Sequence, residues 1–153
     1  MLPCPSVERD KGIRVSAIWG FEARTRLEVP LVTAGVSAGF PSPADDFIDA
    51  RLDLNEFLVA HPAATFFVRV EGTSMIGAGI HPDDILIVDR ALEPRSGSIV
   101  IAVVEGEFTV KRYSCTNGKC WLLAENPKFG PIEVTEGMAV EVWGVVSYVI
   151  HKV

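Results

Sequence analysis

Three short runs of apolar residues decide the fold: residues 66–70 read Phe-Phe-Val-Arg-Val, residues 85–89 read Ile-Leu-Ile-Val-Asp, and residues 99–104 read Ile-Val-Ile-Ala-Val-Val. β-Branched and aromatic residues dominate the runs, and each run is shorter than a typical buried helix. Residues typical of turns, Pro82-Asp83-Asp84, precede the second run. This part of the chain therefore predicts β-strands.

The same pattern continues to the C-terminus, with strands expected over residues 108–113, 121–124, 132–134 and 141–150. Glu105-Gly106-Glu107 predicts a hairpin between two of these strands, and so does Asn117-Gly118, the strongest two-residue hairpin signal. Together the segments predict a mainly β domain of about seven short strands with one or two short helices. The apolar run 142–150 suits either the core or a dimer interface.

The N-terminal third is less regular. Residues 1–30 show no clean period and predict a flexible arm with one short strand over residues 15–19. Residues 31–44 carry no charge and are rich in small residues, glycine and proline, which favours an exposed extended segment. Residues 42–60 predict one kinked helix or two short ones, with start signals at Ser42 and Asp53.

Length and charge narrow the class of protein. A chain of 153 residues predicts one domain. Its net charge of −6 argues against a nucleic-acid binder, which is normally basic. Residues 1–38 carry five basic and four acidic side chains, so the other nine basic and sixteen acidic ones fall in residues 39–153. No apolar run is long enough to cross a membrane, and charges at residues 8–11 interrupt any secretion signal, so we expect a cytoplasmic protein.

Cysteine and histidine give little support for a metal or redox site. The Asn117-Gly118 turn places Cys115 opposite Cys120, which permits a redox switch or half a metal site. Because no histidine or third cysteine lies nearby in the sequence, a reduced structural pair is favoured. The histidines have no metal-ligand spacing, and structural roles are expected for His61, His81 and His151. No metal or cofactor is predicted.

One loop suits nucleophilic chemistry. Residues 71–80 pass through three glycines between two expected strands, so Ser74 would be exposed beside free backbone N–H groups. No histidine is at hand as a base, which leaves a lysine that burial keeps neutral. Lys111 is the candidate, because it lies inside the alternating strand 108–113, whereas the other lysines lie in loops or near the ends.

Several motifs in order resemble the self-cleaving LexA/UmuD serine peptidases, most closely the UmuD subfamily. They are Gly72-Thr73-Ser74-Met75, the run 83–89, the run 106–112, the run 39–44 that reads Gly-Phe-Pro-Ser-Pro-Ala, and two shorter ones at residues 51–55 and 61–65. The resemblance covers about residues 38–150. Only 38 residues precede the matching region, with no helix-turn-helix pattern, so a repressor is not expected.

The resemblance implies a Ser/Lys dyad, with Ser74 as nucleophile and Lys111 as general base. It implies a cut between Ala38 and Gly39, which divides the chain into a regulatory arm (1–38) and a peptidase domain (39–153). Val36 and Phe40 would fill side pockets. The backbone N–H groups of Ser74 and Met75 are expected oxyanion donors.

The resemblance also implies a role in the SOS response. Self-cleavage would be stimulated by the RecA–single-stranded-DNA filament. The shortened homodimer would join a Y-family, UmuC-like polymerase subunit in translesion synthesis, without direct sequence-specific DNA binding. Two alternatives remain: a non-catalytic β-domain adaptor for a polymerase or RecA, and a fragment of a LexA-type repressor. A signal peptidase also pairs serine with lysine, but it would need a membrane anchor.

Overall fold

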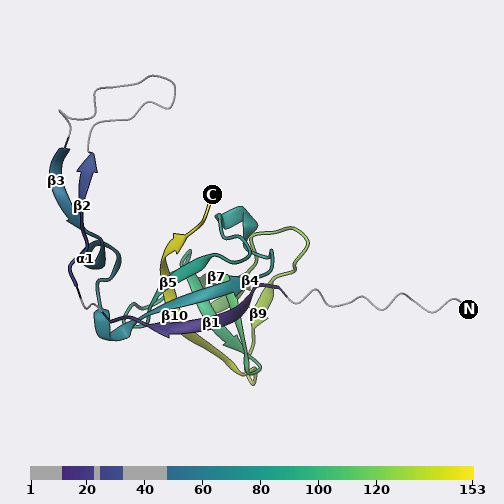
Figure 1. The fold of residues 1–153 in the computed structure, drawn as a ribbon. Helices are drawn as coiled ribbons and strands as arrows, with labels where there is room; N and C mark the ends of the chain where they lie inside the picture. The colour runs from purple at the N-terminus through teal and green to yellow at the C-terminus, as the bar shows by residue number, and fades with distance from the viewer. Residues whose placement is uncertain (1–11, 23–24, 33–47) are drawn as a thin grey trace, which may run out of the picture.

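The computed structural model describes residues 12–22, 25–32 and 48–153. Eight strands form one antiparallel, curled sheet in the order β1-β4-β5-β10-β6-β7-β8-β9, and β2 pairs with β3 in a separate ladder (Figure 1). The strands of the large sheet are β1 (Arg14–Gly20), β4 (Thr65–Glu71), β5 (Ile85–Asp89), β6 (Ile99–Val104), β7 (Glu107–Thr116), β8 (Lys119–Leu123), β9 (Ile132–Val134) and β10 (Val140–Ile150). The mainly β prediction is therefore confirmed, including all seven strands expected after residue 65.

Alternation of side chains along the strands builds the core. In β4, Val68 and Val70 are fully buried while Arg69 between them is exposed. β5 is buried over most of its length, as a strand paired on both sides should be. The larger of two apolar clusters also holds residues from the loop after β4 and from β7, so the core packs directly beneath the candidate site.

The N-terminal third differs from the expectation. β1 (Arg14–Gly20) confirms the short strand, but it is an integral edge strand paired with β4 and not part of a loose arm. β2 (Glu28–Val32) pairs with β3 (Ile48–Asp53), and this ladder stands away from the large sheet (Figure 1). Extended pairing with β2 overrides the helical spacing of residues 48–53, so the helix predicted there is wrong.

The second helix start is confirmed. Asp53 caps α1 (Leu54–Leu58), its side chain accepting from the Asn55 backbone N–H at 2.9 Å. Two 3₁₀ turns follow, η2 (Pro62–Ala64) and η3 (Ile76–Ala78). The start signal at Ser42, most of the extended segment 31–44 and the bond between Ala38 and Gly39 lie outside the described residues.

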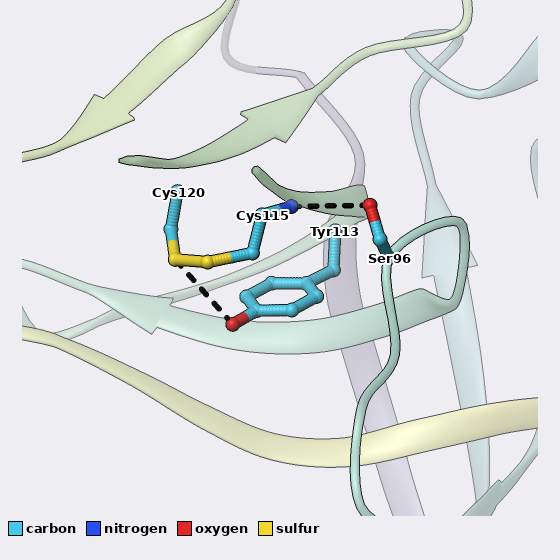
Figure 2. Close-up of a disulfide and its surroundings, with 4 residues drawn as sticks. All are labelled: Ser96, Tyr113, Cys115 and Cys120. Atoms are coloured by element: carbon cyan, nitrogen blue, oxygen red, sulfur yellow. Dashed lines mark hydrogen bonds between the residues drawn. A yellow bond between two sulfur atoms is a disulfide. The ribbon is translucent and has the colours of Figure 1, made fainter. Parts of the chain in front are cut away.

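Both predicted hairpins form. Asn117 and Gly118 adopt positive φ angles of 52° and 77°, which suit a tight turn, and Cys115 faces Cys120 in the register of β7 and β8. The two cysteines form a disulfide, with the Tyr113 hydroxyl beside Cys120 Sγ (Figure 2). The favoured interpretation of a reduced pair is thus wrong for this structure, because the turn makes the two cysteines direct partners across the ladder.

The C-terminal apolar run, which suits either the core or a dimer interface, lies in β10. Its first half pairs with β6 and its second half with β5, and Val145, where the two pairings meet, is buried. Its last residues, Tyr148 to Ile150, are 37–45% exposed. The strand therefore supplies core at one end and an apolar surface at the other. Among the described residues, no helix is long and apolar enough to cross a membrane.

Candidate active site

Ser74 lies in the loop that leaves β4. Gly72 turns the chain with a φ of 95°, and Met75 begins η3 with its side chain fully buried. A second segment supports the loop: the Glu125 N–H donates to Ser74 O at 2.8 Å, and the Asn126 side chain donates to Thr73 O at 3.0 Å. These bonds fix the serine backbone. The expectation that Ser74 is exposed is wrong, because the residue is fully buried beneath the backbone of Ile13.

Lys111 approaches Ser74 from β7. Adjacent side chains of a strand point to opposite faces, and Val110 and Lys111 are both buried, so both faces of β7 are covered here and only 5% of Lys111 is exposed. Nζ lies 3.3 Å from Ser74 Oγ, 2.9 Å from Thr109 Oγ1 and 3.2 Å from Val110 O. Within the described ranges no carboxylate forms an ion pair with this ammonium. The predicted pair is therefore brought together from loop and strand.

Burial alters the chemistry of the lysine. Removing an ammonium from water without an anionic partner disfavours its charged form. Burial accordingly lowers the pKa of Lys111 from 10.5 to about 8. An amine with this pKa is partly neutral near pH 7, and a neutral amine beside a hydroxyl can accept its proton.

The backbone beside Ser74 can receive an oxyanion. Across the described part of the chain, neither the Ser74 N–H nor the Met75 N–H donates to a backbone carbonyl. Both amides belong to a loop held from behind by Glu125 and Asn126. Free, fixed N–H groups next to a nucleophile are the arrangement that stabilises a tetrahedral intermediate.

The two residues that lead into β1, Gly12 and Ile13 (the start of β1), cover the dyad. The Ile13 N–H donates to Ser74 Oγ at 3.0 Å, and the Ile13 side chain is 1% exposed within the main apolar cluster. A Cβ atom on Gly12 would lie 3.3 Å from both Lys111 Nζ and Ser74 Oγ. Gly72 faces the same segment so closely that its own Cβ would lie 2.8 Å from Gly12 O. An extended backbone thus already occupies the space in front of the nucleophile.

A groove of about 580 Å³ continues from this position. It runs between the start of β1 and β7 and reaches Lys111. Three apolar side chains contribute to its wall: Phe108, Phe129 and Ile132. Such a groove suits an extended peptide with apolar side chains.

The arrangement of a buried serine, a lysine of lowered pKa and free amides agrees with the match to known families. Residues 30–147 match the family described as Peptidase S24-like. The chain belongs to this family. It is therefore a serine peptidase of the self-cleaving type, as the resemblance to the LexA/UmuD peptidases implied.

Named relatives give the same result. The chain is 46% identical to Protein SamA of Salmonella typhimurium over 123 residues, which span 80% of this chain and 85% of the relative. It is 43% identical to Protein MucA of Escherichia coli over 121 residues, covering 78% of this chain and 82% of that one. LexA repressor 1 of Pseudomonas syringae pv. tomato is 43% identical over 124 residues, 81% of this chain but 59% of the repressor.

Sequence reasoning missed three features of the site. Thr109 lies two residues before Lys111 on the same face of β7, and the period of the strand could have placed it beside the lysine. The support from Glu125 and Asn126, and the cover from Gly12 and Ile13, depend on contacts across 50 or more residues. No local signal marks such contacts.

The histidines also gain partners that spacing did not indicate. His61 Nδ1 lies 2.6 Å from Asp89 Oδ2, which agrees with a structural role. His151 Nδ1 lies 2.6 Å from Asp84 Oδ1, and the ring of His81 stands 4.7 Å from that of His151. Among the described residues, none of the three histidines forms a hydrogen bond with Ser74 or Lys111.

Proposed function

We propose that this chain cuts its own bond between Ala38 and Gly39, with Ser74 as nucleophile and Lys111 as general base. The observation that carries the proposal is the buried contact of Lys111 Nζ with Ser74 Oγ, in a site where burial lowers the pKa of the lysine to about 8. A structural lysine would normally keep its charge at the surface or beside a carboxylate. Residues 1–38 would then be a regulatory segment, and residues 39–153 the retained peptidase domain.

The dyad supports a complete proton cycle. Neutral Lys111 accepts the hydroxyl proton as Ser74 Oγ forms a bond with the carbonyl carbon of Ala38. The amides of Ser74 and Met75 hold the oxyanion. Collapse of this intermediate breaks the C–N bond, and the Lys111 ammonium returns the proton to the Gly39 nitrogen. Water, deprotonated by the same lysine, then hydrolyses the acyl-enzyme and restores the serine.

The space at the dyad favours a small residue at the cut. The contacts at Gly12 show that a Cβ there lies 3.3 Å from both reacting atoms, so a large side chain at the same place would clash. Alanine before glycine meets this requirement. The apolar groove beside Lys111 suits the neighbouring side chains, Val36 and Phe40.

The relatives support a role in DNA-damage tolerance through the UmuD-like resemblance. We assign to the chain a function as accessory subunit of a Y-family, UmuC-like polymerase in SOS mutagenesis. The RecA–single-stranded-DNA filament would stimulate the cut by favouring a conformation with the bond in the cleft. The net charge of −6 fits a homodimer that reaches DNA through these partners and does not read its sequence.

Mass spectrometry of purified protein tests the peptidase. Wild-type protein incubated at alkaline pH should yield fragments 1–38 and 39–153. The Ser74→Ala and Lys111→Ala variants should each remain whole, while the matched variant Lys119→Ala, changed at a distant turn, should cut as the wild type does. A cut at another bond, or cutting by the Ser74→Ala variant, would contradict the assignment.

Two further measurements test the biological role. RecA filaments assembled on single-stranded DNA should accelerate the cut, and RecA without DNA should not. The 39–153 fragment should co-purify with a Y-family polymerase subunit more strongly than uncut Ser74→Ala protein does. An unchanged rate with the filament would remove the SOS link and leave the peptidase assignment standing.

A further inference from the structure

The first inference concerns a cluster of two histidines and one aspartate that shares no hydrogen bond with Ser74 or Lys111 among the described residues. Asp84 ends the turn before β5, and its carboxylate is 97% covered, with 3% exposure. His81 in the same turn and His151 after β10 lie on either side of it. One ligand atom from each of the three residues falls within 4.8 Å of the others. This set of two imidazoles and one carboxylate is of the type that Zn²⁺ binds.

Both oxygens of the Asp84 carboxylate have partners, Oδ2 accepting from the His81 backbone N–H at 2.8 Å, but one ring nitrogen of the cluster has none. His151 Nδ1 lies 2.6 Å from Asp84 Oδ1. His81 Nδ1 lies 3.8 Å from Asp84 Oδ2 and is a buried atom with no hydrogen-bond partner, although part of its ring is exposed. A buried nitrogen without a partner is costly, and a cation between the three groups would satisfy it.

The spacing fits a tetrahedral ion. Zinc bonds of about 2.0–2.1 Å at tetrahedral angles separate ligand atoms by about 3.3 Å. His151 Nδ1 lies 2.6 Å from one oxygen of Asp84 and His81 Nδ1 lies 3.8 Å from the other, while one ligand atom from each residue falls within 4.8 Å of the others. The register of Ile85 with Ile150 places Asp84 and His151 side by side, so the ligand residues sit on paired strand ends. Small rotations of the rings suffice for binding.

We propose that His81, Asp84 and His151 form a site for a divalent cation of the zinc class, with water as fourth ligand. Bound metal ties the C-terminal end of β10 to the turn that closes the Ser74 loop, since Asp83 N–H and Asp84 O both bond to Val70. The site is independent of self-cleavage, because it holds whether or not Ser74 is a nucleophile.

Titration of untagged protein with Zn²⁺ tests this site, in a Cys4→Ser background that removes a competing thiol. Binding is measured by competition with a chromophoric chelator, and Co²⁺ should give the visible absorption of a tetrahedral complex. His81→Ala and His151→Ala should each weaken Zn²⁺ binding about tenfold or more. His61→Ala, which disrupts a similar histidine–aspartate pair without a second histidine, should not. The proposal is overturned if the parent protein does not bind Zn²⁺, or if the His81→Ala and His151→Ala variants bind Zn²⁺ as tightly as the parent does.

A separate observation carries a second inference, which rests on the proposed function. The backbone at Gly12 and Ile13 fills the space in front of Ser74, yet it presents an N–H group, not a carbonyl carbon, to Oγ. Gly12 O faces Gly72, and no bond from the Ser74 or Met75 amide to it occurs in the described residues. This occupant therefore cannot be attacked in the observed pose.

We infer that the start of β1 is a built-in inhibitor that competes with the segment around Ala38 for the same cleft. Ser74 is fully buried and Lys111 almost so, and Gly12 and Ile13 contact or adjoin both. No second peptide can reach Oγ until these residues leave. Release of the β1 start is thus a step before every cut.

Gly12→Val and Gly20→Val form a matched pair for the test. Valine at residue 12 forces methyl groups against Nζ and Oγ, whereas a Cβ at Gly20, the last residue of β1, meets nothing within 4 Å. Gly12→Val should cut about five- to tenfold faster at Ala38–Gly39, the factor expected from losing about one hydrogen bond. Gly20→Val should cut at the wild-type rate.

Diisopropyl fluorophosphate provides a readout that does not need the chain to enter its own cleft. It should label Ser74 faster in Gly12→Val than in Gly20→Val. Equal labelling and equal cutting in the two variants overturn the inhibitor. If the wild type never cuts at Ala38–Gly39 but labelling still differs, the inhibitor stands and the proposed cleavage fails.

Discussion

The pH dependence of self-cleavage tests the chemistry of Lys111 most directly. Only the neutral amine can accept the serine proton, so the first-order rate constant should follow the neutral fraction. With the pKa at about 8, that fraction rises from about 9% at pH 7 to about 91% at pH 9. We therefore expect about a tenfold increase over this range and a plateau above about pH 9.5.

An ordinary lysine would behave differently. With the pKa at 10.5, the neutral fraction would be about 0.03% at pH 7 and 3% at pH 9, a hundredfold increase with no plateau. Intact-mass spectrometry at fixed intervals measures the loss of full-length protein between pH 6 and 10.5, and circular dichroism checks that the fold persists. A rate that still rises about eightfold between pH 9 and 10, as a pKa of 10.5 predicts, would refute burial as the activating factor.

Three other predictions follow from the same site and from the disulfide. Lys111→Met should abolish cutting and raise the free energy of unfolding by at most about 3 kcal/mol at pH 7, measured by urea denaturation. The pKa of Lys111 is lower in the folded chain than in the unfolded chain, so the charged lysine destabilises the wild-type fold. This destabilisation is full below pH 8 and vanishes as the pH rises towards 10.5. Thr109→Val should lower the plateau rate about tenfold, because the Lys111 amine loses the hydrogen bond to Thr109 Oγ1 that positions it, whereas Thr109→Ser should retain the rate; equal rates would exclude the positioning role. Reduction of Cys115–Cys120 should cost no more than about 2 kcal/mol, since the closed loop is short, and should leave the cutting rate unchanged; a large rate loss would show coupling between hairpin and dyad.

The sequence predicted the strands after residue 65 because short-range rules govern them. Alternation, turn residues and the Asn117-Gly118 dipeptide act over a few positions, whereas Lys111 is buried because both faces of β7 are covered at residues 110 and 111. The helix expected over residues 48–53 failed for the opposite reason. Its apolar spacing permitted either structure, and pairing with β2, some twenty residues earlier in the chain, decided for a strand.

The parts of the candidate site that could not be foreseen depend on distant partners. Ile13 reaches Ser74 across 61 residues, and His151 reaches Asp84 across 67. Sheet order alone makes these neighbours: β1 lies beside β4, and β10 lies beside β5. The spacing of residues in the sequence does not predict this order of strands, whereas the motifs around Ser74 and Lys111 did predict the Ser/Lys pair.

Because β1 pairs with β4 and β2 pairs with β3, cutting the chain would not by itself release the N-terminal fragment. A break between Ala38 and Gly39 falls between β2 and β3, so the departing fragment would carry both β1 and β2. Register pairs from Arg14 to Gly20 still bind β1 to β4, and those from Glu28 to Val32 still bind β2 to β3. The immediate product would be a nicked, non-covalent complex of unchanged mass under native conditions. Any activity of the shortened form would then begin at the dissociation of this complex, with its own rate and its own dependence on concentration.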